Sequence, residues 1–362
     1  MLNNKTIAVV IPAYNEEKQI GEVIETMPDF VDRIVVVNDC STDKTEDIVR
    51  NYFEKKENNG SDIIKKVLEK ESRFNRTKYF IEKQNHDNLY LPCEIVNEDN
   101  PQNRIILINQ SKNGGNGCAI ARGLKWAMDN KIDCTAVMDG DGQMDPAELE
   151  SIVTPIINGE CDFVKGNRLI HRSAWLVMPR ARYIGNSILS IFTKIASGYW
   201  HVTDSQCGYI ALSHKALESI RLYNIYRSYG WPNDILVKLN IAFCTIKEVE
   251  IKPVYNVGET SKMKIWKVIP NISWLLFKSF FKRLWVKYLF RDFHPLFILY
   301  NLGMILSAIS IPYLLKILKA IFSGLTIGNL PVLAFVFLFL TGIQFLLFAM
   351  WMDIQDNERL YK

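Results

Sequence analysis

The sequence predicts an α/β fold in which helices flank a mostly parallel sheet, followed by a membrane-anchored C-terminal part. Three observations indicate this. Short β-branched runs alternate with segments of helical period between Thr6 and Asp141, as in parallel βαβ units. A basic, aromatic stretch occupies positions 256–294, and two long uncharged runs follow it. The chain has 362 residues, of which 48% are hydrophobic, so it can build a full core.

The first part of the chain alternates expected strands with expected helices. We expect strands at Ile7–Ile11, Ile34–Asn38, Ile105–Ile108 and Thr135–Met138, and helices at Glu16–Met27, Asp43–Phe53, Gly115–Asn130 and Pro146–Ile157. Open parallel sheets bind their ligands at the carboxyl ends of the strands. The polar motifs that follow these strands are therefore the candidate site.

The segment 54–103 interrupts this order. It is rich in Lys, Glu and Asn, and its apolar content is low after a helix expected near Asp62–Phe74. We interpret it as an insertion, which is either a lid or partner-binding element or a solvated excursion. The seven cysteines show no C-x-x-C spacing, so reduced thiols are expected rather than disulfides or a zinc site.

Two apolar runs predict a transmembrane hairpin. Leu296–Leu315 has 20 residues and Leu330–Met352 has 23, and none of them is charged. Helices of this length can cross the bilayer core, and we expect the chain to turn around Ser323–Asn329. The alternative is two buried core helices, but helices inside soluble proteins rarely run so far without a charged edge.

The residues before the first run set the expected orientation. Eight basic residues and no acidic one lie between Lys262 and Arg291, whereas only Lys316 and Lys319 lie near the turn. The positive-inside rule then places the basic side in the cytoplasm. We expect no secretory signal, because Met1–Lys5 leads straight into the first strand.

The same basic stretch is interleaved with Trp, Phe and Tyr residues. This pattern predicts amphipathic helices that lie in the headgroup layer and bind anionic membrane lipids. Nucleic-acid binding is disfavoured, because the stretch adjoins a membrane span and the net charge of the chain is only +4.

Two polar turns follow the first two expected strands. In Ile11-Pro-Ala-Tyr-Asn-Glu-Glu17, Pro12 and Asn15 favour a turn that leaves backbone groups free to meet a ligand. In Val37-Asn-Asp-Cys-Ser-Thr-Asp43, Asp39 stands at a strand end, where a carboxylate can bond a nucleobase edge or a ribose hydroxyl. Each motif could instead simply turn the chain or cap the next helix.

The next two motifs indicate phosphate and metal chemistry. Asn113–Gly123 is a glycine-rich entry to a helix, whose amides can approach a diphosphate, although a lone glycine loop is a weak sign. Asp139 and Asp141, with a glycine after each, can converge on one hard cation and a diphosphate. A calcium-binding EF-hand would also need a glutamate at its twelfth position and flanking helices, which are not placed here.

Taken in order, PAYNEE, VVNDCSTD, NGGNGCA and MDGDGQMDP resemble glycosyltransferase family 2, especially the polyprenyl-phosphate glycosyltransferases similar to dolichyl-phosphate mannose synthase. The resemblance continues through Gly166–Arg168, Asp204–Gly208 and the C-terminal hairpin. It implies a GT-A (Rossmann-like) fold, a UDP- or GDP-linked sugar donor, a divalent metal (Mn²⁺ or Mg²⁺) and inversion by single displacement. The implied reaction transfers one hexose to a dolichyl or undecaprenyl phosphate at the cytoplasmic membrane face.

The resemblance also assigns roles to individual residues. The donor-binding residues are Pro12, Tyr14, Glu16, Asp39, Gly114 and Asp139, and the metal ligands are Asp141 and Gln143. The metal would offset the charge that grows on the departing diphosphate. Asp141 and Arg168 are the expected catalytic residues on this reading.

Which residues would contact the acceptor depends on whether the acceptor is a phosphate or a hydroxyl. A lipid phosphate is already an anion and needs positive groups rather than a base, so Arg168, Arg180 and Arg182 are candidate contacts. Ser261 and Lys262 are further candidates, in a segment that resembles the family's G-x-S-K element with one extra residue and without its usual preceding arginine.

A sugar hydroxyl on a lipid-linked glycan would instead require a base. Asp234 is the candidate, although it could equally cap a helix after Pro232. The chain lacks the Q-x-x-R-W motif of processive synthases, which weighs against a polymerase. A nucleotidyltransferase and a non-catalytic nucleotide-sugar sensor are the remaining alternatives. We predict a catalytic domain at 1–255, interfacial helices at 256–294, and a transmembrane hairpin with a short cytoplasmic tail at 295–362.

Overall fold

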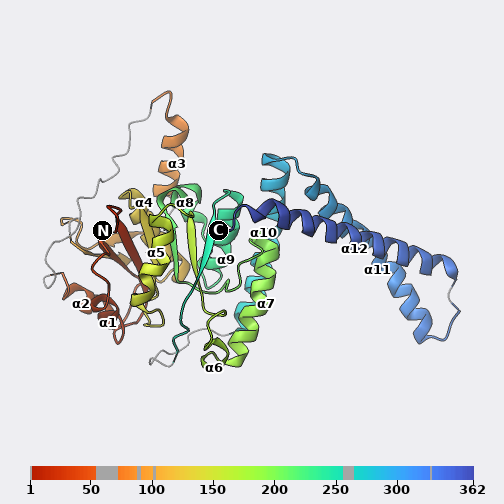
Figure 1. The fold of residues 1–362 in the computed structure, drawn as a ribbon, viewed down its shortest axis with the longest axis horizontal. Coiled ribbons are helices and arrows are strands. Elements are labelled where there is room, and N and C mark those ends of the chain that lie inside the picture. The colour runs from red at the N-terminus through yellow and green to blue at the C-terminus, as the bar shows by residue number, and fades with distance from the viewer. Residues whose placement is uncertain (1, 54–71, 88–90, 101–102, 256–264, 327) are drawn as a thin grey trace.

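The computed structural model describes the whole chain except residues 1, 54–71, 88–90, 101–102, 256–264 and 327 (Figure 1). Its centre is an eight-stranded sheet in the order β3-β4-β2-β1-β5-β7-β6-β8. The strands are β1 (Ile7–Ala13), β2 (Arg33–Asn38), β3 (Cys93–Ile95), β4 (Ile105–Gln110), β5 (Cys134–Val137), β6 (Phe163–Asn167), β7 (Ile210–Ser213) and β8 (Ile246–Glu250). Only β3 and β7 run antiparallel to their neighbours, so the prediction of a mostly parallel sheet is confirmed.

Helices cover both faces of this sheet. One face packs against α1 (Ile20–Glu25), α2 (Thr45–Arg50) and α5 (Leu149–Ile157), which follows the short η1 (Pro146–Glu148). The other face packs against α4 (Asn116–Asp129), α8 (His214–Ser219), η2 (Leu222–Asn224) and α9 (Trp231–Ile241). Alternate residues of each central strand enter opposite cores, which explains why these strands are apolar at most positions.

The expected strands and helices of the first part are all present. The first helix is shorter than predicted, because the backbone amides of Glu16 and Glu17 donate to the side chains of Thr45 and Asp43. These bonds hold the residues after β1 in a loop, and the helix begins only at Ile20.

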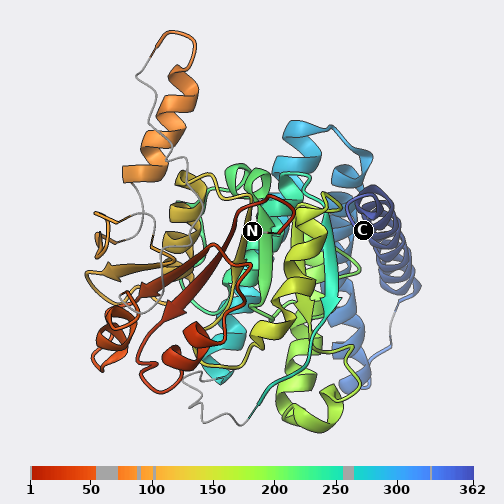
Figure 2. The same cartoon turned by 60° about the vertical axis from the view of Figure 1, so that its left-hand side comes forward.

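The segment interpreted as an insertion contributes to the sheet. Its strand β3 pairs with β4 and forms an edge of the sheet, which the sequence did not predict because only three residues take part. Helix α3 (Arg76–Asp87) stands out from the body in both views (Figures 1 and 2). Most of the helix expected at 62–74 falls on residues 62–71, which lie outside the described part of the chain.

A second layer of helices lies between the sheet and the C-terminal hairpin. It comprises α6 (Ala174–Val177), α7 (Arg180–Ser197), α10 (Ile265–Trp285) and the π-helical η3 (Val286–Arg291). Leu189 and Ala196 of α7 pack against Ile272 and Leu276 of α10. The two helices stand side by side at one end of the sheet (Figure 1).

The last two helices, α11 (Pro295–Phe322) and α12 (Asn329–Glu358), form a hairpin that projects away from the sheet (Figure 1). Their most apolar windows have mean hydropathies of 1.8 and 2.5, and only 6% and 11% of these windows are buried. Core helices of soluble proteins would be mostly buried. Both helices are therefore long, apolar and exposed enough to anchor the chain in a membrane.

The two hairpin helices approach each other through glycines. A Cβ atom on Gly303 would lie 3.0 Å from the carbonyl oxygen of Gly342, and one on Gly342 would lie 2.7 Å from Ser307 Oγ. Small residues at such positions let two backbones pack closely, which is a common way for helices to associate within lipid.

Candidate active site

A cleft of about 780 Å³ opens at the carboxyl ends of the central strands. Most residues that the sequence assigned to the site line it: Pro12, Tyr14, Glu16, Asp39, Asp139, Asp141, Gln143, Arg168 and Arg182. The cleft continues between α7 and α10, where Gly185 and Ile272 contribute to its wall. The structure thus brings residues from segments far apart in the chain into one site.

The loops after β1 and β2 brace each other at the rim of the cleft. Asn15 adopts a left-handed conformation with φ of +55°, its amide donates to Ser41 Oγ at 3.0 Å, and its side-chain oxygen accepts the Thr42 amide at 2.8 Å. This bracing holds Tyr14, which is 36% exposed, and Glu16 at the edge of the cleft.

Asp39 anchors the glycine-rich loop. Its two carboxylate oxygens accept the amides of Gly114 at 2.7 Å and Gly115 at 2.9 Å, while burial raises the pKa of the Asp39 carboxyl despite these bonds. The Gly117 amide donates to the carbonyl of Arg227 at 3.0 Å. These three amides are therefore engaged within the protein, and Gly114 does not line the cleft. Diphosphate binding by the glycine-rich loop stays a prediction.

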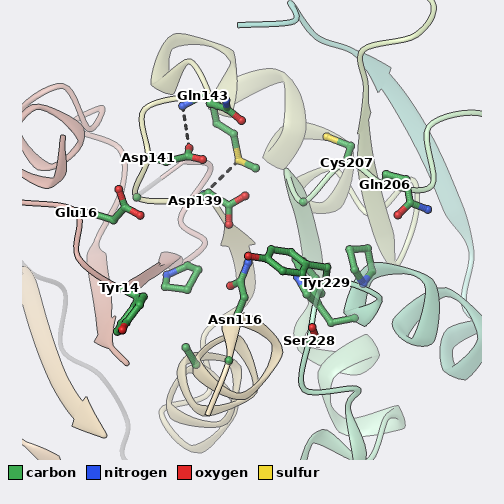
Figure 3. Close-up of a pocket in the computed structure, with 18 of the residues that line it drawn as sticks. Tyr14, Glu16, Asn116, Asp139, Asp141, Gln143, Gln206, Cys207, Ser228 and Tyr229 are labelled. Atoms are coloured by element: carbon green, nitrogen blue, oxygen red, sulfur yellow. Dashed lines mark hydrogen bonds between the residues drawn. The ribbon is translucent and has the colours of Figure 1, made fainter. Parts of the chain in front are cut away.

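Asp139 and Asp141 lie on the loop after β5. Gly142, with φ of +73°, makes the turn that lets Asp141 Oδ1 accept the Gln143 amide at 3.0 Å. Figure 3 shows both carboxylates facing the same space, with Glu16 on the opposite loop and the phenol of Tyr229 reaching in from the other side. Strand ends and one tight turn therefore bring Asp139 and Asp141 to the same part of the cleft, with Glu16 lining it from the loop after β1.

The charge distribution at this point favours a cation. Burial, and next the charge of Asp141, raise the pKa of the Asp139 carboxyl. Within the described residues, Asp139 Oδ1 and Asn116 Oδ1 are buried and accept no hydrogen bond. Buried acceptors without donors are costly, so a positively charged or hydrogen-donating ligand would stabilise this site.

A hard divalent metal fits this donor set. No group of three or more His, Cys, Asp or Glu side chains is placed as a full ligand set in the part of the chain that the structure describes. Mg²⁺ and similar ions commonly take one or two carboxylates and complete their shell with substrate phosphates and water. Asp139 and Asp141 can supply such a partial shell, with Gln143 beside them.

Arg168 is held by a buried carboxylate. Its Nε and Nη2 atoms donate to the two carboxylate oxygens of Asp204 at 2.8 and 3.2 Å, and Asp204 is fully buried. Burial alone would raise the pKa of Asp204, but Arg168 and then Lys165 hold it below its usual range. Asp204 therefore fixes the orientation of the guanidinium at the cleft and offsets part of its positive charge.

The other acceptor candidates have different positions. Arg182 lines the cleft and stacks on Tyr255, with its guanidinium carbon 5.5 Å from the ring centre. Arg180 is exposed, stacks on Trp175 at 5.9 Å and does not line the cleft. Ser261 and Lys262 lie outside the described residues.

Asp234 does not line the cleft. It is 8% exposed, and its Oδ2 accepts the Tyr226 amide at 2.9 Å and forms an ion pair with Lys238. Lys238 also donates to the carbonyl of Asn224. The pair thus holds the loop 224–229, and a role as a base finds no support in this geometry.

Several cleft residues were not identified from the sequence. They include Asn116, Asn186, Ser228, Tyr229, Trp231 and Tyr255. Asn116 lay within a motif that was recognised for its glycines, so its polar side chain could have been considered. The others lie in segments without a phosphate or metal pattern, and only folding brings them to the strand ends.

Comparison with known proteins identifies a matching family model and several similar proteins. The family model described as Glycosyl transferase family 2 matches residues 8–76 and 94–221. The "UDP-N-acetylglucosamine--dolichyl-phosphate N-acetylglucosaminyltransferase" of Methanococcus voltae is 32% identical over 253 residues, covering 70% of this chain and 87% of that protein. A dolichyl-phosphate beta-glucosyltransferase of Trichomonas vaginalis is 23% identical over 297 residues, covering 77% and 74%.

Two further proteins are similar to this chain. The undecaprenyl-phosphate mannosyltransferase of Micrococcus luteus is 28% identical over 172 residues, covering 46% of this chain and 69% of that protein. Glucosyl-3-phosphoglycerate synthase from Mycobacterium tuberculosis, solved with Mn²⁺, UDP and glucosyl-3-phosphoglycerate, superposes with a TM-score of 0.46 at 17% identity, covering 77% and 80%, which is too weak a likeness for functional conclusions.

The family that the sequence motifs indicated is confirmed by a family model that matches more than half of the chain and by the Methanococcus voltae relative. The chain belongs to glycosyltransferase family 2.

Proposed function

We propose that this glycosyltransferase transfers a single hexose from a UDP- or GDP-linked donor to a polyprenyl phosphate, with inversion, at the cytoplasmic face of a membrane. The named relatives transfer N-acetylglucosamine, glucose and mannose, so the acceptor class is shared among them while the sugar varies. The sugar and the nucleotide therefore stay open within this proposal.

The observation that carries the proposal is the continuity of the cleft. It runs from Asp139 and Asp141 to Ile269 and Ile272 in the first part of α10, a helix whose last turns contact the hairpin that can anchor the chain. A water-soluble acceptor would need no such path. A phosphate on a lipid would reach the metal-binding end of the cleft by this route.

The outer surface beside this path suits a membrane. Exposed apolar side chains gather on α6, α7 and α10: Trp175, Leu176, Val177, Ile184, Ile188, Ile191, Phe192, Ile269, Trp274 and Phe277. No acidic residue occurs from Arg168 to Thr203, although five basic ones do. An apolar and basic face favours anionic lipid, and the cytoplasmic leaflet is the usual source of that charge.

The residues of the cleft support displacement without a general base. A phosphate monoester loses its second proton near pH 6 and is a ready nucleophile. One of its oxygens would form a bond to the anomeric carbon while the bond from that carbon to the diphosphate breaks, and the nucleoside diphosphate leaves with the electron pair. Arg182 and Arg168 would orient the acceptor anion, and Asp139 would hold the donor sugar.

A divalent metal at Asp141 and Gln143 would supply charge stabilisation for the leaving diphosphate. Asp141 and Gln143 would hold it, with their spacing set by the turn at Gly142. The described contacts of the Asp234 carboxylate are with Tyr226 and Lys238. These contacts do not favour transfer to a hydroxyl with Asp234 as base.

The direct test is a transfer assay. The full-length protein in vesicles is incubated with Mn²⁺, undecaprenyl or dolichyl phosphate, and radiolabelled UDP- and GDP-sugars, one at a time. The proposal predicts an organic-extractable glycolipid whose sugar is released by mild acid. The absence of product with every donor, together with product on a glycan hydroxyl, would overturn it.

A further inference from the structure

A buried polar cluster joins the last turns of α12 to the catalytic domain. Its centre is Arg283 of α10, which is completely buried and donates through Nη1 and Nη2 to the two carboxylate oxygens of Asp353, both at 2.7 Å. Asp353 belongs to α12 and is also completely buried. The ion pair therefore connects α10 to α12, the second helix of the hairpin.

The same guanidinium also holds the end of α7. Its Nε donates to the carbonyl of Ala196 and its Nη2 to the carbonyl of Ile195, both at 3.0 Å. These carbonyls lie in the last turn of the helix, where a cation interacts favourably with the helix dipole. Gly198 ends the helix with φ of +78°, and a Cβ atom there would lie 2.5 Å from Nη1 of Arg283. The glycine makes room for this contact.

Further bonds extend the cluster to α9. Tyr288 Oη donates to Asp353 at 2.7 Å, and Asn357 Nδ2 donates to Tyr288 at 2.8 Å. Lys287 Nζ donates to Asn357 at 2.6 Å and to Asn240 of α9 at 3.1 Å. One hydrogen-bonded network thus includes α7, α9, α10, η3 and α12.

These contacts matter because α7 forms part of the cleft. Arg182, Gly185 and Leu189 of α7 line the path between α7 and α10. The far end of the same helix is the part that Arg283 holds. A change in how α12 meets α7 would therefore tilt or shift the cleft relative to the membrane span.

From this geometry we infer that Arg283 is a positioning residue, which with Asp353 fixes the height and angle of the cleft above the bilayer so that a lipid-borne phosphate arrives in line with the donor. The inference rests on the proposed acceptor. Arg283 touches neither donor nor acceptor and acts through α7. Bidentate pairing suits this task, because it fixes orientation as well as distance.

The test compares two acceptors with the full-length enzyme in phosphatidylethanolamine and phosphatidylglycerol vesicles. Undecaprenyl phosphate is held in the bilayer, whereas geranyl phosphate is a short analogue that reaches the cleft from water. The main variant replaces the pair together, Arg283→Met with Asp353→Leu, because an apolar pair of similar volume usually preserves folding where a single replacement strands a buried charge.

We expect kcat/KM for undecaprenyl phosphate to fall roughly tenfold or more in this double variant, since small misplacements of reacting groups slow reactions strongly. Transfer to geranyl phosphate should stay within about twofold of the wild-type rate, because that acceptor does not depend on the height of the cleft. Arg359→Met is the matched control. It removes a 63% exposed arginine of the same region and should change neither rate.

Equal losses with both acceptors, or no loss with either, would overturn the inference, because a general structural role would lower both rates alike. If the double variant does not fold, Arg283→Lys serves the same comparison, since it keeps the charge and loses the two-point geometry. The rates of the wild-type enzyme test the proposed function separately, because transfer to neither acceptor would reject the lipid-phosphate acceptor. The role of Arg283 is tested by the rates of the variant relative to those of the wild-type enzyme.

Discussion

Arg168 faces the cleft only because Asp204, fully buried behind it, accepts both of its guanidinium hydrogen bonds, with Nε to Oδ2 at 2.8 Å. Breaking a buried ion pair by removing one charge costs about 3–5 kcal/mol. Asp204→Asn should therefore lower the free energy of unfolding by about this amount and reduce transfer as Arg168 loses its orientation. Denaturant melts and steady-state rates measure both effects.

An exposed pair provides the control for Arg168 and Asp204. Glu46 and Arg50 on α2 form an i,i+4 ion pair with side chains 34% and 46% exposed. Glu46→Gln should change stability by no more than about 0.5 kcal/mol and leave transfer unaffected. Similar losses in Asp204→Asn and Glu46→Gln would contradict the buried-pair explanation.

Asp141→Asn tests the metal. The amide keeps an oxygen that can accept the Gln143 amide but removes the negative charge that a divalent cation needs. We expect transfer to fall roughly a hundredfold or more, and the thermal shift given by UDP with Mn²⁺ to disappear, while the apo melting temperature changes little. EDTA should abolish the same shift in the native protein. A nucleotide shift that is insensitive to both changes would argue against the metal role.

Asp234→Asn separates a base from a structural anchor. Loss of a general base lowers a rate by about 10²–10⁴-fold. Because Asp234 holds the Tyr226 amide and Lys238 instead, we expect less than a tenfold fall in kcat, with a lowered melting temperature. Lys238→Met should behave in a similar way. A hundredfold loss of kcat in Asp234→Asn with unchanged stability would restore the hydroxyl-acceptor hypothesis.

Gly185 tests the acceptor path. It lies within α7 and lines the cleft, and a Cβ atom there would meet nothing within 4 Å. Gly185→Leu should stabilise the helix by up to about 1 kcal/mol, yet its side chain would obstruct the route between α7 and α10. We predict a raised KM for polyprenyl phosphate and unchanged UDP binding by calorimetry. Gly185→Ala, which adds a single carbon, should gain similar stability with a smaller rise in KM.

The ionisation of Asp162, which lies outside the cleft, should make the stability of the protein depend on pH. Its carboxylate accepts the Thr245 amide at 2.9 Å and pairs with Lys215 at 3.0 Å. Burial opposes ionisation, but these contacts hold the pKa of Asp162 below its usual value. The folded state thus binds this proton less readily than the unfolded state, so the stabilisation is present above about pH 4 and is lost as the pH falls through the folded pKa.

Melting temperatures measured between acidic and neutral pH test this sign. Asp162→Asn should be less stable than the native protein at neutral pH, and the difference should shrink below about pH 4. A difference that grows on acidification would mean that the pKa of Asp162 is raised instead.

Local pattern was sufficient for much of the fold. The strands at Ile7–Ala13 and Arg33–Asn38 are apolar at every position except Arg33 and Asn38, and such runs bounded by turns have few alternatives to a buried parallel strand. The short strand β3 was missed, because three residues carry almost no periodicity and its pairing depends on β4 being in place.

The sequence by itself determined the family, the sheet, the long apolar helices and the acidic pair Asp139 and Asp141, since each depends on residues that are neighbours in the chain. Only the tertiary structure decided what those groups contact. It turned Asp39 to the amides of Gly114 and Gly115, and it paired Asp234 with Lys238 outside the cleft. Contacts between distant segments arise from packing, which no local pattern specifies.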